Sequence, residues 1–217
     1  ANDVASIIVL TQIFEGLTRL DPNGEPQEAM ASNIDISEDG KKYTFTIRDG
    51  VTWTDGSPVT AEDFEYAWKW VLDPENAEAR AAHQLFIIKN AEAVKKGEVP
   101  IDEVGFRAID EKTFEVELEY AADYFLKLTA NHVFSPMKKG INEEHPDWDL
   151  SAGEHYITNG PFYLAEWDQK NKIVFKKNQN YWDADTVKLE TINMPIITDE
   201  NTEFNMYQNG ELDYAGH

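Results

Sequence analysis

The residue types that most often carry chemistry occur here in patterns that match no common metal or catalytic motif. Five histidines, His83, His132, His145, His155 and His217, are spread along the chain without an i, i+4 pair or an HExxH pattern. Zinc sites draw their ligands from such spacings, so we expect no metal site. The chain has no cysteine, which excludes disulfides, thiol catalysis and thiolate metal ligands.

Carboxylates offer two further kinds of site. Asp35, Ser37 and Asp39 take the first ligand positions of a calcium-binding loop, but the twelfth position is Thr46, where that loop needs a bidentate glutamate. We therefore interpret the three residues ending at Gly40 as a hairpin turn. A glycosidase-like acid pair needs only two carboxyl groups at a set separation. Among 41 Asp and Glu residues such a pair remains an alternative.

The motifs that hold nucleotides or activate a serine are missing. The sequence has no GxSxG, no GxxxxGK[ST] and no GxGxxG. It therefore contains none of the motifs that form the nucleophile elbow of a hydrolase, a P-loop or a dinucleotide-binding loop. We expect no cofactor. Four tryptophans, Trp53, Trp148, Trp167 and Trp182, offer faces that can stack on a ligand, although such large rings more often pack in cores. Of these two interpretations, the core is favoured for each ring.

The composition describes a folded and strongly acidic protein. Its 217 residues are 41% hydrophobic and carry 19 basic against 41 acidic residues, a formal charge of −22. Nucleic acid is excluded as an expected partner because phosphate binding depends on Lys and Arg. The acidity indicates a solvated surface, with attraction of cationic ligands as the alternative. No segment reaches the ~18 apolar residues of a membrane span, and any export signal or lipid-bearing cysteine is expected to have been removed or never to have existed.

The elements that must position any site are helices and strands in irregular order, which predicts a mixed α and β fold. Thr60 is placed to cap a helix whose apolar residues follow helical spacing until Pro74. A second helix is expected from Val4 to Phe14. The predicted strands and hairpin arms are Leu17–Leu20, Lys42–Arg48, Val104–Ile109, Thr113–Glu119, Tyr163–Leu164, Ile173–Phe175 and Leu189–Ile196, and a last helix is expected over Asn201–Tyr207.

One long string resembles a known family. Ser37 to Pro74 reads SEDGKKYTFTIRDGVTWTDGSPVTAEDFEYAWKWVLDP, and it is similar to the characteristic region of the oligopeptide- and dipeptide-binding proteins of ABC importers (family 5 extracellular solute-binding proteins). Further strings occur in that family's order and extend the resemblance over essentially the whole chain: QIFEGLTRLDPNGEPQEAMA, KNAEAVKKGE, VGFRAIDEKTFEVELE, ADYFLKLTA, TNGPFYLAEW, NQNYWDADTVKLETINMPII and NMYQNGELDYAG.

The resemblance implies a particular fold and domain organisation. It is the α/β, periplasmic-binding-protein-like (type II) fold, of which only the first lobe is expected here, incomplete and interrupted by an inserted α+β domain. Residues 1–20 and 157–217 would form that lobe, and residues 21–156 would form the insertion. Members of the family are more than twice as long, so the chain resembles an N-terminal fragment that lacks the second lobe.

The resemblance also implies the function. Such proteins capture peptides and hand them to an ABC transporter permease in the membrane, without covalent chemistry and so without being enzymes. They act outside the cytoplasm, in the periplasm or lipid-anchored to the outer face of the membrane, and a monomer is expected. The alternatives are a same-family receptor for a nickel chelate, a glycan or a signalling peptide, and an acid-pair hydrolase.

Candidate ligand contacts come only from this resemblance. The first set, which would offer backbone groups to the ligand, is Ile7, Ile8, Val9 and Leu10. Asn159 and Gly160 lie in a loop expected near the cleft. Helix core for the first set and a plain turn for the second are the competing interpretations.

In relatives that this chain resembles, a tyrosine lines the ligand pocket, and the chain has no tyrosine at the corresponding place. Close relatives often read Ser-Pro-Tyr-Ala where this chain has EARAA, from Glu78 to Ala82. His83, Gln84 and Phe86 are the candidate substitutes. The departure leaves open that the ligand itself differs.

Overall fold

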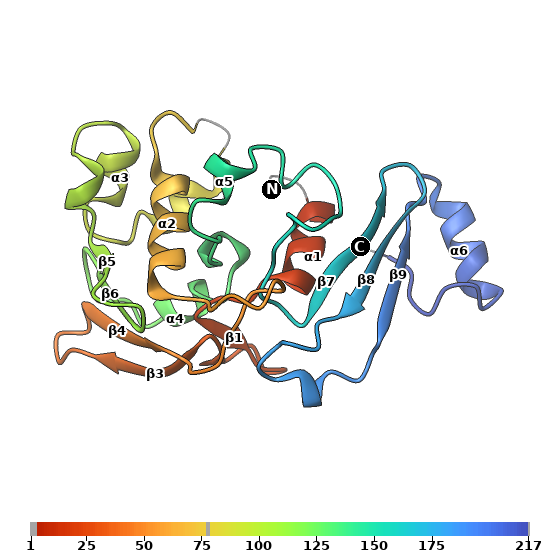
Figure 1. The fold of residues 1–217 in the computed structure, drawn as a ribbon, viewed down its shortest axis with the longest axis horizontal. Coiled ribbons are helices and arrows are strands. Elements are labelled where there is room, and N and C mark those ends of the chain that lie inside the picture. The colour runs from red at the N-terminus through yellow and green to blue at the C-terminus, as the bar shows by residue number, and fades with distance from the viewer. Residues whose placement is uncertain (1–3, 77–78, 217) are drawn as a thin grey trace.

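The computed structural model describes residues 4–76 and 79–216, and helices and strands alternate irregularly along these ranges. The strands form antiparallel sheets of two, four and three strands. Figure 1 shows the four-stranded sheet at one end of the molecule, the three-stranded sheet toward the other end, and helix α1 (Val4–Ile13) between them. The irregular order of elements confirms the mixed α and β fold predicted from the sequence.

Alternating apolar residues build the four-stranded sheet. Its order is β3 (Ala31–Ile36), β4 (Lys42–Ile47), β6 (Thr113–Glu117) and β5 (Phe106–Ala108). Tyr43, Phe45 and Ile47 of β4 are buried, while the polar residues between them lie nearer the surface. The hairpin turn between β3 and β4 contains Gly40 at φ 69°, a conformation that favours glycine. The calcium-like segment is therefore the predicted turn.

Helix α2 (Ala61–Leu72) covers one face of this sheet. Its Trp68 is fully buried and meets Phe106, Phe114 and Phe134 edge-on, with ring centroids 5.3, 5.0 and 5.1 Å away. Edge-to-face contacts of this kind are favourable because a ring's positive edge meets a negative face. The helix predicted from apolar spacing is therefore confirmed, and its buried stripe forms the centre of the larger core.

A buried carboxylate organises the start of α2. Asp63 accepts hydrogen bonds from the Thr60 backbone N–H at 2.9 Å, the Trp53 indole N–H at 3.1 Å and the Lys139 backbone N–H at 2.9 Å. Burial raises the pKa of Asp63, although these hydrogen bonds act in the opposite direction. The predicted helix start at Thr60 is thus joined to two loops by one side chain.

Short elements connect the larger ones. Strand β1 (Thr18–Leu20) pairs with β2 (Pro26–Glu28) across a turn in which the Gly24 N–H donates to the Asp21 carbonyl. The remaining short helices are α3 (Ala91–Lys95), α4 (Phe125–Leu128), α5 (Ile141–Glu144), and the 3-10 turns η1 (Arg80–Leu85), η2 (Ile101–Glu103), η3 (His132–Phe134) and η4 (Ala184–Thr186).

The three-stranded sheet packs against α1 around a smaller core. Its strands are β7 (Phe162–Asp168), β8 (Lys172–Lys177) and β9 (Thr191–Pro195). Ile13 of α1 is buried against Phe162, Leu164 and Phe175 of the sheet. These strands and α1 agree with the elements predicted from the sequence, within a few residues at their ends.

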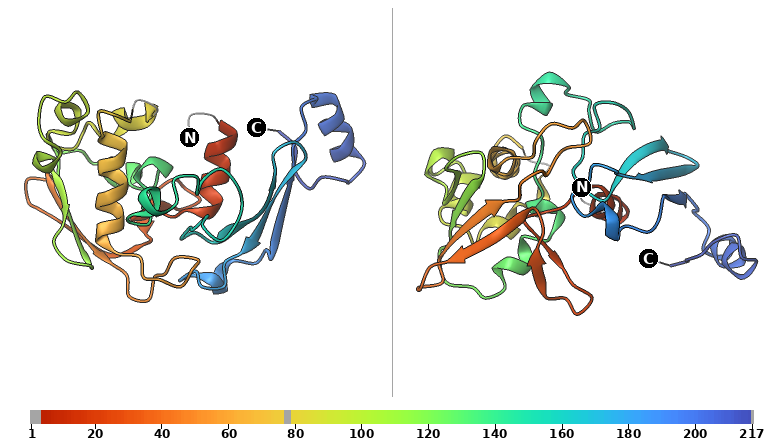
Figure 2. Two further views of the ribbon diagram at one scale, coloured as in Figure 1. Left: turned by 45° about the horizontal axis from the view of Figure 1, so that its top comes forward. Right: turned by 60° about the horizontal axis from the view of Figure 1, so that its bottom comes forward.

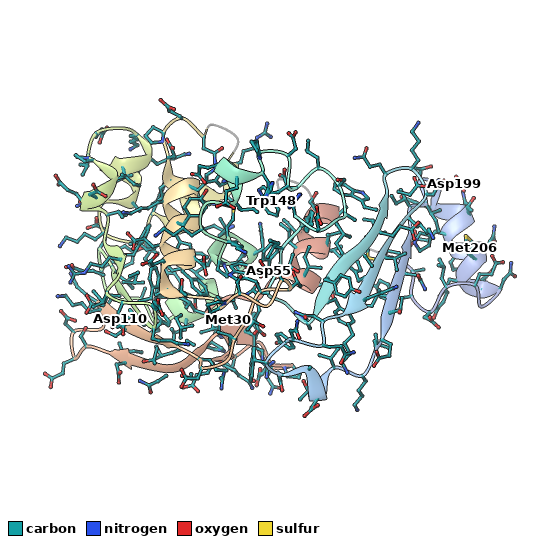
Figure 3. The ribbon with its side chains drawn as sticks, in the orientation of Figure 1. Met30, Asp55, Asp110, Trp148, Asp199 and Met206 are labelled. Carbon is teal, nitrogen blue, oxygen red and sulfur yellow. The ribbon has the colours of Figure 1, made fainter. Side chains whose placement is uncertain are left out.

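Helix α6 (Glu200–Gln208) extends from the sheet at the end of the molecule farthest from the β5–β6 hairpin (Figure 2). Figure 3 shows this separation through Asp199 and Met206 on one side and Asp110 on the other. No residue of α6 is buried, and the rings of Phe204 and Tyr207 are about half exposed. No helix in residues 4–76 and 79–216 is both long and apolar enough to cross a membrane.

A buried amide joins the end of α1 to the start of β7. The side chain of Asn159 is fully buried; its Oδ1 accepts from the Glu15 backbone N–H at 3.1 Å and its Nδ2 donates to the Glu15 carbonyl at 2.9 Å. The Gly160 N–H donates to the Ile13 carbonyl at 2.8 Å. We call these contacts of Asn159 and Gly160 the α1 clamp. They supply partners for backbone groups that a helix end leaves unpaired.

Only a residue without a side chain fits at position 160 of the clamp. A Cβ there would lie 2.5 Å from the Ile13 carbonyl carbon and 2.7 Å from the Phe14 nitrogen. These are backbone atoms within the turn that ends α1, so they cannot move aside as a flexible side chain would. Gly160 is therefore required by close approach of two backbones.

The Glu15 side chain extends the same junction toward the segment after β8. Its Oε1 accepts from the Tyr181 hydroxyl at 2.5 Å, and its Oε2 accepts from the Trp182 indole N–H at 2.6 Å. Arg19 lies 3.8 Å from Glu15 and forms a 2.8 Å ion pair with Asp183. Burial raises the pKa of Glu15, while the two hydrogen bonds and Arg19 act to lower it. The same burial, with the carboxylate beside it, raises the pKa of Tyr181.

Substitution of Gly160 tests the clamp. Gly160→Ala is expected to lower the free energy of unfolding by roughly 1–3 kcal/mol, the usual cost of overpacking, measured by urea denaturation. Gly153→Ala is the control, because a Cβ at Gly153 meets no atom within 4 Å; it should be neutral or stabilise by a few tenths of a kcal/mol. Equal effects of the two variants would contradict the steric requirement at Gly160.

Removal of the Tyr181 hydroxyl tests the buried carboxylate. Glu15 has a raised pKa when folded, so its contribution to stability is fully present below its ordinary pKa and is lost as pH rises through the raised value. Tyr181→Phe removes a hydrogen bond that favours the ionised form. Its cost should therefore grow over this pH range, toward roughly 1.5–3 kcal/mol for a bond to a charged group.

Urea denaturation at a series of pH values measures this dependence. Tyr163→Phe is the matched control, since Tyr163 is half-buried in β7 and its hydroxyl has no hydrogen bond to the described residues. A Tyr181→Phe cost that stays constant with pH would show that Glu15 does not titrate in contact with Tyr181.

Candidate functional site

The first set of predicted ligand contacts lies within helix α1. Ile7, Ile8, Val9 and Leu10 are all half-buried. Val9 and Leu10 pack on the smaller core, and the Leu10 carbonyl accepts the Phe14 backbone N–H at 2.9 Å. The helix thus already uses the Leu10 carbonyl, and the expectation that this segment offers backbone groups to a ligand stays a prediction. Side chains of the segment remain partly accessible.

The structure gives Asn159 and Gly160 internal partners. Both residues are fully buried, and their polar groups form the α1 clamp described above. A ligand in solvent cannot reach the Asn159 amide in this arrangement. Asn159-Gly160 is more than a plain turn, because the Asn159 amide forms hydrogen bonds with Glu15, a residue 144 positions away in the sequence.

The three residues offered as substitutes for the family tyrosine lie at or next to the 3-10 turn η1. His83 is exposed and its Nδ1 lies 3.1 Å from the Arg80 carbonyl. Phe86 is half-buried against the larger core. Gln84 is half-buried, and its Oε1 atom is buried without a hydrogen-bond partner among the described residues. Glu78, the first residue of EARAA, lies outside the described residues.

Helix α1 and turn η1 are both in contact with turn η3, the 3-10 turn over residues 132–134. The structure thus places the α1 and η1 candidates on elements that flank one short turn. In η3, burial lowers the pKa of His132. The α1 and η1 candidates therefore belong to one region of the fold, although they do not form a single cluster of side chains.

Two histidines that looked unrelated in the sequence are stacked. The rings of His145 and His155 have centroids 3.7 Å apart and planes inclined by 17°. Their separation of ten positions gives no helical or strand signal, so sequence analysis missed the pair. In residues 4–76 and 79–216, no group of three or more His, Asp or Glu side chains is arranged to hold a metal ion. His217 lies outside the described residues.

The four candidate tryptophans divide between core and surface. Trp53 is 1% exposed and belongs to the larger core, which confirms the core interpretation for that ring. Trp182 is half-buried beneath the Arg48 guanidinium, whose carbon lies 4.0 Å from the ring centroid. Trp167 packs at the edge of the smaller core. Trp148 is half-buried in the loop after α5, with its ring centroid 5.4 Å from that of Tyr156.

Among the described residues, Glu15 and Asp63 have carboxyl pKa values raised by burial, a property that general acids often share, yet both carboxyl groups are held by internal hydrogen bonds. The two oxygens of Glu15 accept from Tyr181 and Trp182. Those of Asp63 accept from the start of α2, an indole and a loop N–H. Both carboxylates therefore have structural roles.

Comparisons with known proteins agree with this architecture. The family model described as "Bacterial extracellular solute-binding proteins, family 5 Middle" matches residues 25–217. The chain is 50% identical to the oligopeptide-binding protein OppA of Bacillus subtilis over 216 residues, which cover 100% of this chain and 39% of that protein. The chain therefore spans about two-fifths of this relative.

Solved structures of solute-binding proteins also match nearly the whole chain, which again covers only part of each of them. The substrate-binding domain of an oligopeptide ABC transporter from Bacillus anthracis has a TM-score of 0.92 at 42% identity, over 98% of this chain and 41% of that one. Listeria monocytogenes OppA bound to peptide has a TM-score of 0.92 at 34% identity, over 98% and 42%. These matches confirm the predicted type II periplasmic-binding-protein-like fold, present in part. The chain belongs to the bacterial extracellular solute-binding proteins of family 5.

Proposed function

We propose that the protein is the N-terminal part of a receptor that captures peptides outside the cytoplasm and delivers them to an ABC importer. The observation that carries the proposal is the match, over nearly the whole chain, to a relative whose structure contains a bound peptide. The receptor would act as a monomer, in the periplasm or lipid-anchored to the outer face of the membrane. Its partner there would be the membrane permease of the importer.

The proposed first lobe consists of residues 1–20 and 157–217, and residues 21–156 form an inserted domain. The two buried cores support this division. The smaller core joins α1 to the three-stranded sheet, and the larger core is built mainly from residues 30–134. Leu17 and Tyr181 are exceptions, because they belong to the larger core. They lie beside Glu15 and Trp182, where the two parts meet.

In the proposed mode of binding, an extended peptide lies between this lobe and a second lobe outside these 217 residues. Main-chain hydrogen bonds of the kind that add a strand to a sheet would give affinity, and hydrated pockets would accept varied side chains. Closure of the two lobes is the only mechanical step. Because the interior of α1 uses its own carbonyls, contacts from Ile7 to Leu10 would come from side chains.

Turn η1 is the proposed wall of a side-chain pocket. Gln84 supports this role because a buried acceptor without a donor costs roughly 1–3 kcal/mol, and a ligand N–H or a water would satisfy its Oε1. The family tyrosine is replaced here by EARAA, so a different solute of the same family, such as a nickel chelate, a glycan or a signalling peptide, is the second candidate. Exposed His83 and half-buried Phe86 would then shape the specificity.

The longer protein, extended to the length of its relatives, gives the direct test. Saturating peptide should raise its Tm by several degrees, since a ligand at 100 times its Kd adds about 2.7 kcal/mol to the free energy of unfolding. The measurement is differential scanning calorimetry with a mixed peptide library, followed by mass spectrometry of the bound fraction. An equimolar mixture of free amino acids is the control.

The same samples distinguish the alternatives. Recovery of intact peptides supports capture, whereas cleaved peptides or oligosaccharides would support an acid-pair hydrolase. Stabilisation by nickel chelates or glycans with no response to any peptide would contradict peptide transport and favour the other solute.

A further inference from the structure

The loop between α5 and β7 borders an open cavity of about 430 Å³ that has no part in the α1 clamp. Backbone turns hold the loop in shape: the Trp148 N–H donates to the His145 carbonyl at 3.0 Å, and the Tyr156 N–H donates to the Gly153 carbonyl at 3.1 Å. The Trp148 indole N–H donates to Asn142 Oδ1 at 2.8 Å, which fixes the ring. Figure 3 shows Trp148 in this loop. The cavity therefore has ordered walls.

Aromatic rings form those walls. Trp148 and Tyr156 have centroids 5.4 Å apart with planes inclined by 59°. The stacked rings of His145 and His155 line the same cavity. Trp148 and Tyr156 present negative ring faces that attract cations. Because Trp148 and Tyr156 are half-buried rather than buried, they remain accessible to a ligand.

The lining is rich in carboxylates. Glu144, Asp147 and Glu154 are exposed acidic residues around the cavity, and the lining contains no lysine or arginine. Glu154 already lies 3.4 Å from His155 Nε2, which shows that its carboxylate reaches the rings. A cation in the cavity would therefore share its lining with three carboxylates.

A neighbouring cavity provides an internal comparison. It has a volume of about 300 Å³ and shares His145, His155, Glu144 and Glu154 with the first, but Lys138 and Lys139 also line it. These lysines form ion pairs with Asp55 and Glu62. The second cavity thus contains two lysines with their ion-pair partners, whereas the first adds Asp147, Trp148 and Tyr156 to the shared residues and contains no lysine or arginine.

We propose that the loop cavity binds an organic cation, a guanidinium or alkylammonium group, beside the Trp148 and Tyr156 rings. Its volume lies within the range of small-molecule sites, roughly 300–1,000 Å³, which suits an arginine side chain. A metal ion is the wrong class of ligand, because no metal-holding group of side chains occurs in the described ranges. The inference depends only on residues 142–156 and is independent of peptide capture between two lobes.

NMR titration of the ¹⁵N-labelled protein of the printed sequence tests the proposal, with the Trp148 indole N–H as a local reporter. Nα-acetyl-arginine amide should shift this signal in a saturable manner. Nα-acetyl-citrulline amide has nearly the same shape without the charge. Its affinity should be lower by roughly tenfold or more. Equal binding of the two, or no saturable shift at tens of millimolar, would overturn the proposal.

Variants locate the site. Asp147→Asn and Glu154→Gln should each weaken arginine-amide binding by roughly 2- to 5-fold, as expected for exposed charge pairs. Glu38→Gln makes the same charge change in the exposed β3–β4 turn and should leave the affinity unchanged. An equal loss in Glu38→Gln would show that general acidity, and not the cavity, attracts the ligand. Unchanged affinity in both loop variants would also overturn the assignment.

A second probe identifies the source of the cation. Tetramethylammonium binding as tightly as the arginine amide would indicate a free small cation, whereas preference for the arginine amide would indicate a cationic side chain. The titration requires no second lobe. A titration without binding would therefore not contradict peptide capture by the longer protein. Failure of peptide capture would likewise leave the cavity assignment standing.

Discussion

The pairing of the Asn159 amide with the backbone of Glu15 is the contact on which the position of α1 against the three-stranded sheet depends. It joins residues 144 positions apart, and it is fully buried, so no water competes for its hydrogen bonds. The Glu15 side chain continues the junction to Tyr181 and Trp182, and the Asn178 amide reaches the Gly160 carbonyl at 3.0 Å. One residue at the end of α1 therefore holds the three-stranded sheet and the following segment in place.

Elements defined by local patterns were predictable from the sequence. In α2, the apolar spacing placed Phe64 and Trp68 on one face, Thr60 and Asp63 marked the start, and Pro74 marked the end. The alternation in β4 and the turn at Gly40 were predictable for the same reason, since each depends on residues only a few positions apart. The resemblance to a family then supplied the topology, which periodicity alone does not contain.

Contacts between distant residues were not predictable. Asn159-Gly160 carries the composition of a turn, and the sequence contains no signal that its amide pairs with Glu15 or that Gly160 avoids a collision with Ile13. The stacking of His145 and His155 likewise depends on how one loop folds back. Polar residues in long-range contact leave no periodic pattern, so a ligand-site interpretation and a structural one look alike until the partners are known.

The acidity of the chain need not have a single explanation. Carboxylates dispersed on a wet surface interact weakly, because water screens them, and such residues mainly keep a protein soluble. Around the loop cavity, exposed carboxylates lie beside half-buried rings, whose faces themselves attract cations. The same residue type can therefore solvate the protein over most of its surface and attract a cation at one place, and what separates the two is the aromatic wall.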